Sequence, residues 1–324
     1  MKCIKMLSIA MALFGITVVS SAQTIQEVVE SRNKGSELMA AGDLDGAIAE
    51  LEKCVELAKK VGEDAEEHQI VAESALPNLY MQKATKINAT RDFPATLKAL
   101  EVAVAAAEKY NNPGVKESAE KIIPQIYYAI GAADFQAKKF DEAIQNLDQV
   151  IARDPNMAMA YFIKGASYQS LKDEAKMEEN FKLAIEKGTA SNNAQAVQQS
   201  KTQLVNYFNA VGTTAQGAKR WDDAIAAFSK TTEIDNQNPT AYYSLAACYN
   251  EKKSWDNAIA SLEKALEFRT EKDRWSLDGA YFQFGTAYAG KKDNDKACEY
   301  FKKIGAGNFQ ASAKYQIETV LKCK

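Results

Sequence analysis

The sequence contains a single histidine, His68, and no glycine-rich phosphate loop. One histidine excludes metal sites built on a histidine pair, and it makes a triad of nucleophile, base and orienting group hard to build. A phosphate loop would have to follow a strand, and no segment after residue 22 has the alternation typical of a strand. We therefore expect no enzyme, no cofactor and no metal site.

Proline and dense runs of basic residues are also scarce, with only 6 prolines in 324 residues. Hydrophobic residues make up 46% of the chain and charged residues 26%, which is typical of a soluble helical protein and not of a disordered or collagen-like one. Binding of phosphates needs a basic face, and no stretch of lysine and arginine supplies one. Nucleic acid is therefore not an expected partner.

The first 22 residues have the pattern of a cleavable signal peptide. Lys2 and Lys5 precede an apolar run over residues 6–19, and small residues follow up to Ala22. The run is shorter than the roughly 20 residues that span a bilayer, so we expect no membrane span after cleavage. We predict a signal peptide over 1–22 and an exported mature chain over 23–324, whose formal charge falls from −3 to −5.

Four cysteines remain after residue 22, and their spacing matches neither a compact disulfide framework nor a metal knuckle. Cysteine is often buried as a small hydrophobic residue, and this is our main interpretation for Cys54 and Cys248. The same interpretation applies to Cys298 and Cys323. A bond between these two stays open, because both belong to the last predicted helices.

One sequence motif, here called the recurring phrase, occurs several times along the chain. Each copy opens with a turn and continues as an amphipathic helix, with acidic residues near its start and apolar residues at spacings of three and four. Weaker copies surround Thr96 and Met177. The clear copies are GDLDGAIAELEKCV at 42–55, KFDEAIQNLDQVI at 139–151, RWDDAIAAFSKTT at 220–232, SWDNAIASLEKAL at 254–266 and DNDKACEYFKKI at 293–304.

A second helical stretch with small and aromatic residues precedes each phrase. In segment 239–272 the two stretches carry Tyr242, Leu245, Ala246, Tyr249, Ala258, Leu262 and Ala265. In this pattern, repeated about every 34 residues, the chain resembles the tetratricopeptide repeat (TPR) family. The resemblance implies an all-α fold, a right-handed superhelical solenoid of about seven TPR hairpins. Repeats are expected near 28–61, 77–110, 124–157, 158–191, 205–238, 239–272 and 278–311, with a C-terminal capping helix at 309–324.

The spacing of the repeats departs from the family pattern. Equivalent positions of the phrase are separated by 49, 47, 34, 47, 34 and 39 residues. The extra residues of the three longest gaps are helix-forming, so we predict several first helices lengthened by about three turns. Pro77 and Pro124 fall where the regular repeat resumes, and we expect each to kink or break its helix. A binding role for the insertions and tolerated length variation both stay open.

In the TPR family, the first helix of each hairpin lines the inner surface of the superhelix. The lysine, asparagine and arginine clamp that chaperone-tail binders of this family use for an acidic C-terminus is missing here. We expect a groove for an extended, largely neutral segment, with rings on apolar groups and amides on its backbone. Alternatively, several rings pack between hairpins. The fifth and twelfth repeat positions give the candidate groove residues Tyr128, Phe135, Phe162, Gln169, Asn209, Gln216, Tyr243, Asn250 and Phe282.

The resemblance thus implies a non-catalytic scaffold that binds a protein or peptide partner. Exported members of the family often act in the cell envelope, so we expect a periplasmic location, with secretion as the alternative. A glycan-binding module using the same groove is the second functional hypothesis, because uncharged rings and amides also suit sugar faces. The identity of the partner and the formation of a homo-oligomer stay open.

Overall fold

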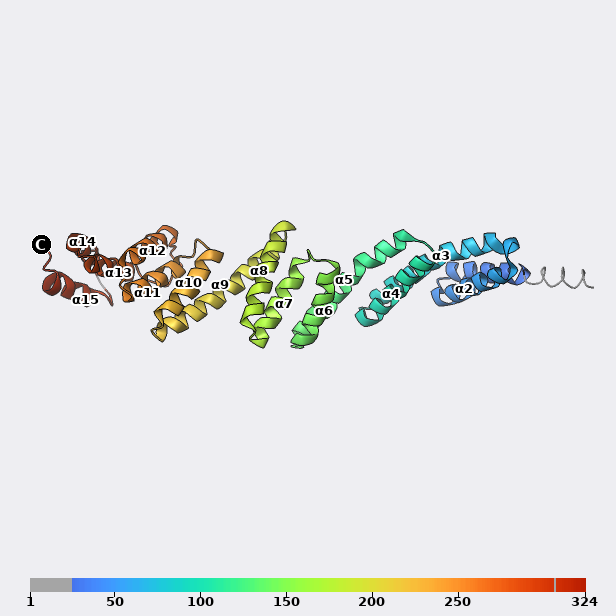
Figure 1. Cartoon of the computed structure of the whole chain (residues 1–324), viewed down its shortest axis with the longest axis horizontal. Coiled ribbons are helices and arrows are strands. Elements are labelled where there is room, and N and C mark those ends of the chain that lie inside the picture. The colour runs from blue at the N-terminus through green and yellow to red at the C-terminus, as the bar shows by residue number, and fades with distance from the viewer. Residues whose placement is uncertain (1–24, 306) are drawn as a thin grey trace, which may run out of the picture. The chain divides into compact units, whose positions relative to one another are not determined.

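The computed structural model describes residues 25–305 and 307–324. The predicted signal peptide at 1–22 lies outside these residues. All regular elements within the described residues are helices, which confirms the predicted all-α fold (Figure 1). None of them is long and apolar enough to cross a membrane. The chain forms two compact units, Met1–Lys172 and Asp173–Lys324, here called the N-terminal and C-terminal units.

The N-terminal unit is a succession of helices in which each packs on the next along the chain. Residues 25–40 are helical, and Val28 from this helix joins the first core cluster with Leu51 and Leu76. The following helices are α2 (Leu44–Val61), the short 3₁₀ helix η1 (Glu63–Ala65), α3 (Glu66–Asn88), α4 (Phe93–Lys109), α5 (Pro113–Gln136), α6 (Phe140–Arg153) and α7 (Ala158–Leu171).

The C-terminal unit repeats the same plan, again with sequential helices in contact (Figure 1). It ends in a short α-helix that continues into a π-helical turn. Its elements are α8 (Glu174–Ala190), α9 (Ala194–Gly217), α10 (Trp221–Ile234), α11 (Pro239–Glu251), α12 (Trp255–Phe268), α13 (Leu277–Gly290), α14 (Asn294–Lys302), α15 (Gln310–Tyr315) and η2 (Gln316–Val320).

Close approach of paired helices depends on a glycine opposite a bulky residue. A Cβ added to Gly212 of α9 would lie 2.7 Å from the Phe228 ring of α10, and one added to Gly285 of α13 would lie 2.6 Å from Phe301 of α14. Both rings are almost fully buried. The small residue and the large one therefore fit together as one packing unit, which is how a hairpin hides its apolar stripe.

The predicted lengthening of first helices is confirmed. α3, α5 and α9 contain 23, 24 and 24 residues, whereas α7, α11 and α13 contain 14, 13 and 14. The inserted residues continue the helix and bury a small or apolar side chain about once per turn, for example Ala196, Ser200 and Leu204 of α9. Each insertion therefore extends the packed surface of its hairpin.

Of the predicted kink or break at Pro77 and Pro124, the break is wrong. Both prolines lie inside continuous α-helices, α3 and α5. A proline removes one main-chain hydrogen bond and crowds the preceding turn. Here both rings are buried, and the residues beside them, such as Leu76 and Ile123, are buried as well. Packing on the neighbouring helices thus outweighs the local cost of the proline.

Helix starts are fixed by aspartate and asparagine side chains. Asp43, Asp92, Asp173 and Asp293 each accept a hydrogen bond from the main-chain N–H three residues later, at 3.0 to 3.2 Å. Such a side-chain cap satisfies one of the N–H groups that a helix start leaves without a partner. In the copies at 42–55 and 293–304, the acidic residue near the start of the phrase is therefore a capping residue.

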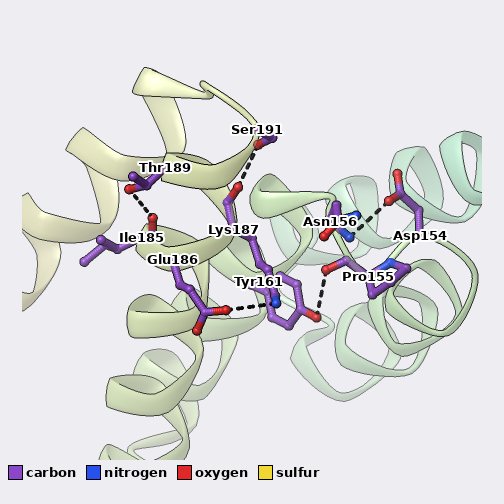
Figure 2. A network of polar contacts seen from close by, with 9 residues as sticks. All are labelled: Asp154, Pro155, Asn156, Tyr161, Ile185, Glu186, Lys187, Thr189 and Ser191. Atoms are coloured by element: carbon purple, nitrogen blue, oxygen red, sulfur yellow. Dashed lines mark hydrogen bonds and ion pairs between the residues drawn. The ribbon is translucent and has the colours of Figure 1, made fainter.

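The same turn occurs once in each unit before a regular hairpin. In the N-terminal unit the Tyr161 hydroxyl donates to the Pro155 carbonyl at 3.2 Å, and Asp154 accepts from the Asn156 N–H at 3.1 Å (Figure 2). In the C-terminal unit the Tyr242 hydroxyl donates to the carbonyl of Asn236 at 3.3 Å. The shared offset of six residues shows that Tyr161 and Tyr242 anchor the preceding turn in the same way.

The end of α8 illustrates how helix carbonyls are satisfied. The Thr189 and Ser191 hydroxyls each donate at 2.7 Å to the carbonyls of Ile185 and Lys187 (Figure 2). The Lys187 carbonyl also accepts from the Ser191 main-chain N–H at 2.9 Å, so these hydroxyls add a second donor to carbonyls of the last turns. The long helix α9 then begins after a cap by Asn193.

The turn between paired helices carries a strained position. Lys219, Lys253 and Lys292 have positive φ angles of 56°, 59° and 65°, where the first repeat has Gly42. A left-handed conformation costs a non-glycine residue roughly 1–2 kcal/mol. We expect Lys253→Gly to raise the free energy of unfolding of the C-terminal unit by about 0.5–1 kcal/mol in a urea titration.

A matched change inside the helix should have the opposite sign. Glu251, the last residue of α11, is exposed. Because glycine is a poor helix residue, Glu251→Gly should lower the free energy of unfolding by about 0.5–1 kcal/mol. Loss of stability in Lys253→Gly would contradict the assignment of strain to the turn.

The C-terminal segment is fastened to the last hairpin. Cys298 of α14 and Cys323 form a disulfide with a Cα–Cα distance of 5.7 Å, which decides the question that the sequence leaves open. Phe309, Ile317 and Leu321 pack against the buried cluster around Phe301. The segment after α14 thus covers the apolar side of the last hairpin.

Candidate functional site

Several first helices of successive hairpins touch one another directly. In the N-terminal unit α3 contacts α5 and α5 contacts α7, and in the C-terminal unit α11 contacts α13. The residues that the sequence places on this face are here called the first-helix face. The N-terminal unit carries Tyr128, Phe135, Phe162 and Gln169, and the C-terminal unit carries Asn209, Gln216, Tyr243, Asn250 and Phe282.

In the N-terminal unit the three predicted aromatic residues lie together against the core. Tyr128, Phe135 and Phe162 are partly buried and pack against the cluster that contains Leu147. Burial raises the pKa of the Tyr128 hydroxyl, so this group stays protonated at neutral pH. The fourth predicted residue, Gln169 near the end of α7, is exposed. These rings are therefore shared between the core and the surface.

On α9 the two predicted amides differ in their surroundings. Asn209 accepts a hydrogen bond at 3.2 Å from the Thr231 hydroxyl of α10, and Thr231 is fully buried. That bond ties Asn209 to the packing of its own hairpin. Gln216, two turns later, is half-buried, and its side-chain amide forms no hydrogen bond within the described residues. Only Gln216 thus keeps its whole amide for a partner.

Tyr243 of α11 is covered by a residue that the sequence did not single out. The Trp275 ring lies parallel to the Tyr243 ring, with centroids 4.7 Å apart and an interplanar angle of 8°. Trp275 belongs to the connection between α12 and α13, over residues 269–276. The Arg269 guanidinium carbon lies 5.2 Å from the Trp275 ring centroid. The Tyr243 ring, the Trp275 ring and the Arg269 guanidinium therefore pack on one another in that order.

Phe282 of α13 is also partly buried among other rings. Its centroid lies 5.4 Å from that of Phe301 and 5.3 Å from that of Phe309. Phe301 belongs to α14, and Phe309 precedes α15. Substitution of Phe282 would therefore disturb the junction between the last hairpin and the C-terminal segment, as well as any partner contact.

Asn250 and Gln283 present buried acceptors without a donor. The Asn250 Nδ2 donates to the main-chain carbonyl of Gln283 at 3.1 Å, which links α11 to α13 and fixes the orientation of the amide. The Asn250 Oδ1 and the Gln283 Oε1 have no hydrogen-bond partner among the described residues. A buried amide oxygen without a donor costs about 1–3 kcal/mol, so the pair is suited to receive N–H groups from outside.

Sequence reasoning missed Gln283, Trp275 and Arg269. Gln283 sits one position after Phe282, at a repeat position that the family does not assign to the groove. Trp275 and Arg269 lie in the connection that makes the last repeat spacing 39 residues. That irregular spacing is the one feature of the sequence that could have drawn attention to them.

Two hollows in the described surface lie elsewhere. One of about 280 Å³ lies between α3 and α4 and includes Tyr80 and Val102. The other, of about 460 Å³, lies among α8, α9 and α10 and includes Tyr207 and Val211. Burial and a hydrogen bond with Glu174 raise the pKa of Tyr207 to about 12. None of the nine predicted residues lines either hollow.

The titratable groups suited to chemistry are held in structural contacts. The Arg32 Nη1 lies 3.0 Å from the His68 Nδ1, so the imidazole accepts that hydrogen bond. Among the described residues no group of three or more His, Cys, Asp or Glu side chains could hold a metal ion. Cys54 and Cys248 are buried, and burial raises the pKa of both thiols, that of Cys248 to about 11. Their thiols are therefore poor nucleophiles at neutral pH.

Models of the tetratricopeptide repeat match the sequence over four segments. Two matches cover 215–277 and 128–192, and a third model matches 33–61 and 278–304. Together these segments make up more than half of the chain. The chain belongs to the tetratricopeptide repeat family. Each TPR match contains residues of the recurring phrase, which confirms the resemblance seen in the sequence. No curated protein matches the chain significantly.

Solved TPR structures are similar to the chain at low identity. MamA protein is 22% identical over 62% of this chain and 97% of that one, with a TM-score of 0.33. A tetratricopeptide repeat protein from Parabacteroides merdae is 14% identical over 92% and 100%, with a TM-score of 0.31. The TPR2AB-domain:pHSP90 complex of yeast Sti1 is 16% identical over 90% and 95%, with a TM-score of 0.30. The family assignment rests on the sequence models and not on these similarities.

TPR proteins are generally interaction scaffolds without catalytic activity. The arrangement in this chain agrees with that role, because its first-helix face presents rings and amides and no set of groups arranged for a reaction. Many charged residues of the C-terminal unit are in surface pairs, such as Lys182 with Glu178.

Proposed function

We propose that this chain is a non-catalytic scaffold of the cell envelope. It holds an extended and largely neutral segment of a partner protein along the first-helix face of the C-terminal unit. The observation that carries the proposal is the pair of buried acceptors, Asn250 Oδ1 and Gln283 Oε1. Main-chain N–H groups of an extended segment are the donors that fit two such acceptors on neighbouring helices.

The surrounding residues suit a neutral segment. Tyr243, Phe282 and Gln216 are uncharged and half-buried, so each offers part of its surface to a partner. Aromatic residues at the centre of an interface usually contribute much of the binding energy. A glycan would also use rings and amides, so the experiment below includes a sugar array that separates the two hypotheses.

Two features support export of the chain. The pattern of residues 1–22 is typical of a signal peptide, and the Cys298–Cys323 disulfide is a bond that persists in oxidising compartments. We propose the periplasm as the location, with secretion as the alternative. Fractionation of the source cells with an antibody against the protein tests this, and recovery with the cytoplasmic enzymes would contradict it.

Selection from a library of displayed random peptides tests the proposed binding. We expect the selection to enrich peptides that bind the immobilised protein. Their affinity should fall about fivefold in Gln283→Met and about tenfold in the double variant Gln283→Met/Gln216→Met. Each change removes hydrogen-bonding groups at nearly constant side-chain volume. Gln203→Met makes the same change on the opposite side of α9 and should leave the affinity unchanged.

The result also separates the two functional hypotheses. A sugar array probed with the same protein should give no signal. Binding to the array that is lost in Gln283→Met would replace the peptide proposal with the glycan one. Peptide binding that is equally strong in all variants would mean that the first-helix face is not the site.

A further inference from the structure

Two buried hydrogen-bond donors lie beside the first-helix face and have no acceptor. Trp275 is 9% exposed, and its Nε1 has no hydrogen-bond partner among the described residues. The Arg269 Nε is likewise buried and without a partner. Burial of an N–H group without an acceptor is unfavourable, so two such groups in one place point to a ligand that supplies acceptors.

Both donors belong to one irregular connection. It runs over residues 269–276, eight residues, whereas the connection between α10 and α11 has only four, residues 235–238. The Arg269 guanidinium lies over the Trp275 ring at 5.2 Å, and Trp275 stacks on Tyr243 of the first-helix face. The extra residues of this repeat thus bring a cation and an indole N–H to the edge of the proposed binding surface.

The charge on Arg269 is not neutralised within the described residues, because Arg269 forms no ion pair there. Asp273 of the same connection is already occupied. It accepts from the Thr270 N–H at 2.7 Å and from the Thr270 hydroxyl at 3.0 Å. It also accepts from the Thr240 hydroxyl at 3.3 Å. The site therefore combines a positive charge with two donors that have no partner among the described residues.

We propose that Arg269 and Trp275 form a binding site for a carboxylate of the bound protein segment. The guanidinium presents planar donors that match a carboxylate, and the indole N–H supplies a further donor. Both residues lie outside the repeat positions that line TPR grooves. The proposal rests on the proposed function, since the carboxylate belongs to the segment on the first-helix face. That segment is then neutral along its length and anchored by one acid.

The indole N–H signals in a ¹⁵N-correlated NMR spectrum test this directly, because the chain has only three tryptophans. We expect sodium acetate, compared with sodium chloride at equal ionic strength, to shift the Trp275 signal to saturation. The signals of Trp221 and Trp255 should stay unchanged. Arg269→Gln should weaken acetate binding by at least about tenfold, because it removes the charge-assisted hydrogen bond.

Two further variants keep the test independent of folding defects. Arg274→Gln removes an exposed cation from the same connection and should leave acetate binding unchanged. Trp275→Phe keeps the ring and removes the N–H, so acetate should still shift the Arg269 Nε–H signal but with lower affinity. The unchanged positions of the other two indole signals report that the unit remains folded.

Four outcomes would overturn the proposal. These are no saturable shift with acetate, a shift with phosphate but not acetate, an equal shift in Arg269→Gln, and an equal loss in Arg274→Gln. The acetate result does not depend on the peptide selection, so failure of this site and failure of the proposed function are distinguishable. Two modified forms of a selected peptide show which carboxylate is bound. Amidation of the C-terminus removes the terminal carboxylate, and replacement of Asp and Glu by Asn and Gln removes the side-chain carboxylates.

Discussion

Phe228→Ala should lower the free energy of unfolding of the C-terminal unit by about 3–5 kcal/mol. Phe228 is 2% exposed and packs in the cluster with Ala215, Leu245 and Cys248, so it joins its own hairpin to the next first helix. Truncation removes the buried ring and leaves a cavity that two rigid helices cannot close. Urea unfolding followed by circular dichroism measures the change.

The effect of Gly212→Ala on the free energy of unfolding should change sign between the unaltered protein and Phe228→Ala. With Phe228 present, Gly212→Ala places a Cβ 2.7 Å from the ring and should cost about 1–3 kcal/mol through overpacking. In Phe228→Ala the same change meets open space and should stabilise by up to about 1 kcal/mol, because alanine is the better helix residue. Gly217→Ala, with no atom within 4 Å of the added Cβ, should stabilise in both backgrounds.

The sign reversal is specific to direct packing of Gly212 on Phe228. A double-mutant cycle isolates the energy of that pair, since the two residues are in contact and Gly217 is not. If Gly212→Ala were equally destabilising with and without the Phe228 ring, the close approach of α9 and α10 would not depend on this pair.

Loss of the Cys298–Cys323 disulfide should destabilise the end of the C-terminal unit by about 3 kcal/mol. The bond closes a loop with a sequence separation of 25 residues, and it holds the segment that covers Phe301. We expect the Cys298→Ser/Cys323→Ser variant to lose amide protection over residues 307–324 in hydrogen exchange. The thermal melt should fall with it.

Reduction of the unaltered protein provides the control. Dithiothreitol should reproduce the effect of the double substitution. It should have no further effect on that variant, because the remaining thiols of Cys54 and Cys248 are buried and unbonded. An unchanged melt and unchanged exchange in reductant would mean that the disulfide does not hold this segment.

Much of the fold follows from the sequence because its determinants are local and repeated. The phrase beginning at Asp43 or Asp293 contains its own cap and its own apolar stripe, so each copy predicts a helix and its buried face. Insertions with helical periodicity predict longer helices for the same reason. Pro77 and Pro124 were the local exception, because tertiary packing outweighs the propensity of a single residue.

The candidate site is less predictable, because it depends on contacts between hairpins. The family positions locate Tyr243 and Asn250, but they do not reveal that Trp275 stacks on Tyr243 or that Gln283 supplies the acceptor next to Asn250. Those contacts depend on the displacement of α13 along α11 and on the path of the connection over 269–276. No periodic pattern in the sequence predicts that displacement or that path.

Site-specific photocrosslinking tests the proposed binding face most directly. A photoreactive phenylalanine analogue is placed either at Ala247, one turn after Tyr243 of the first-helix face on α11, or at Ala260, on the exposed side of α12. It is then irradiated with a peptide from the library selection. We predict crosslinks from position 247 that excess unlabelled peptide prevents, and none from position 260. Crosslinks from 260 but not from 247 would contradict the assignment of partner binding to the first helices.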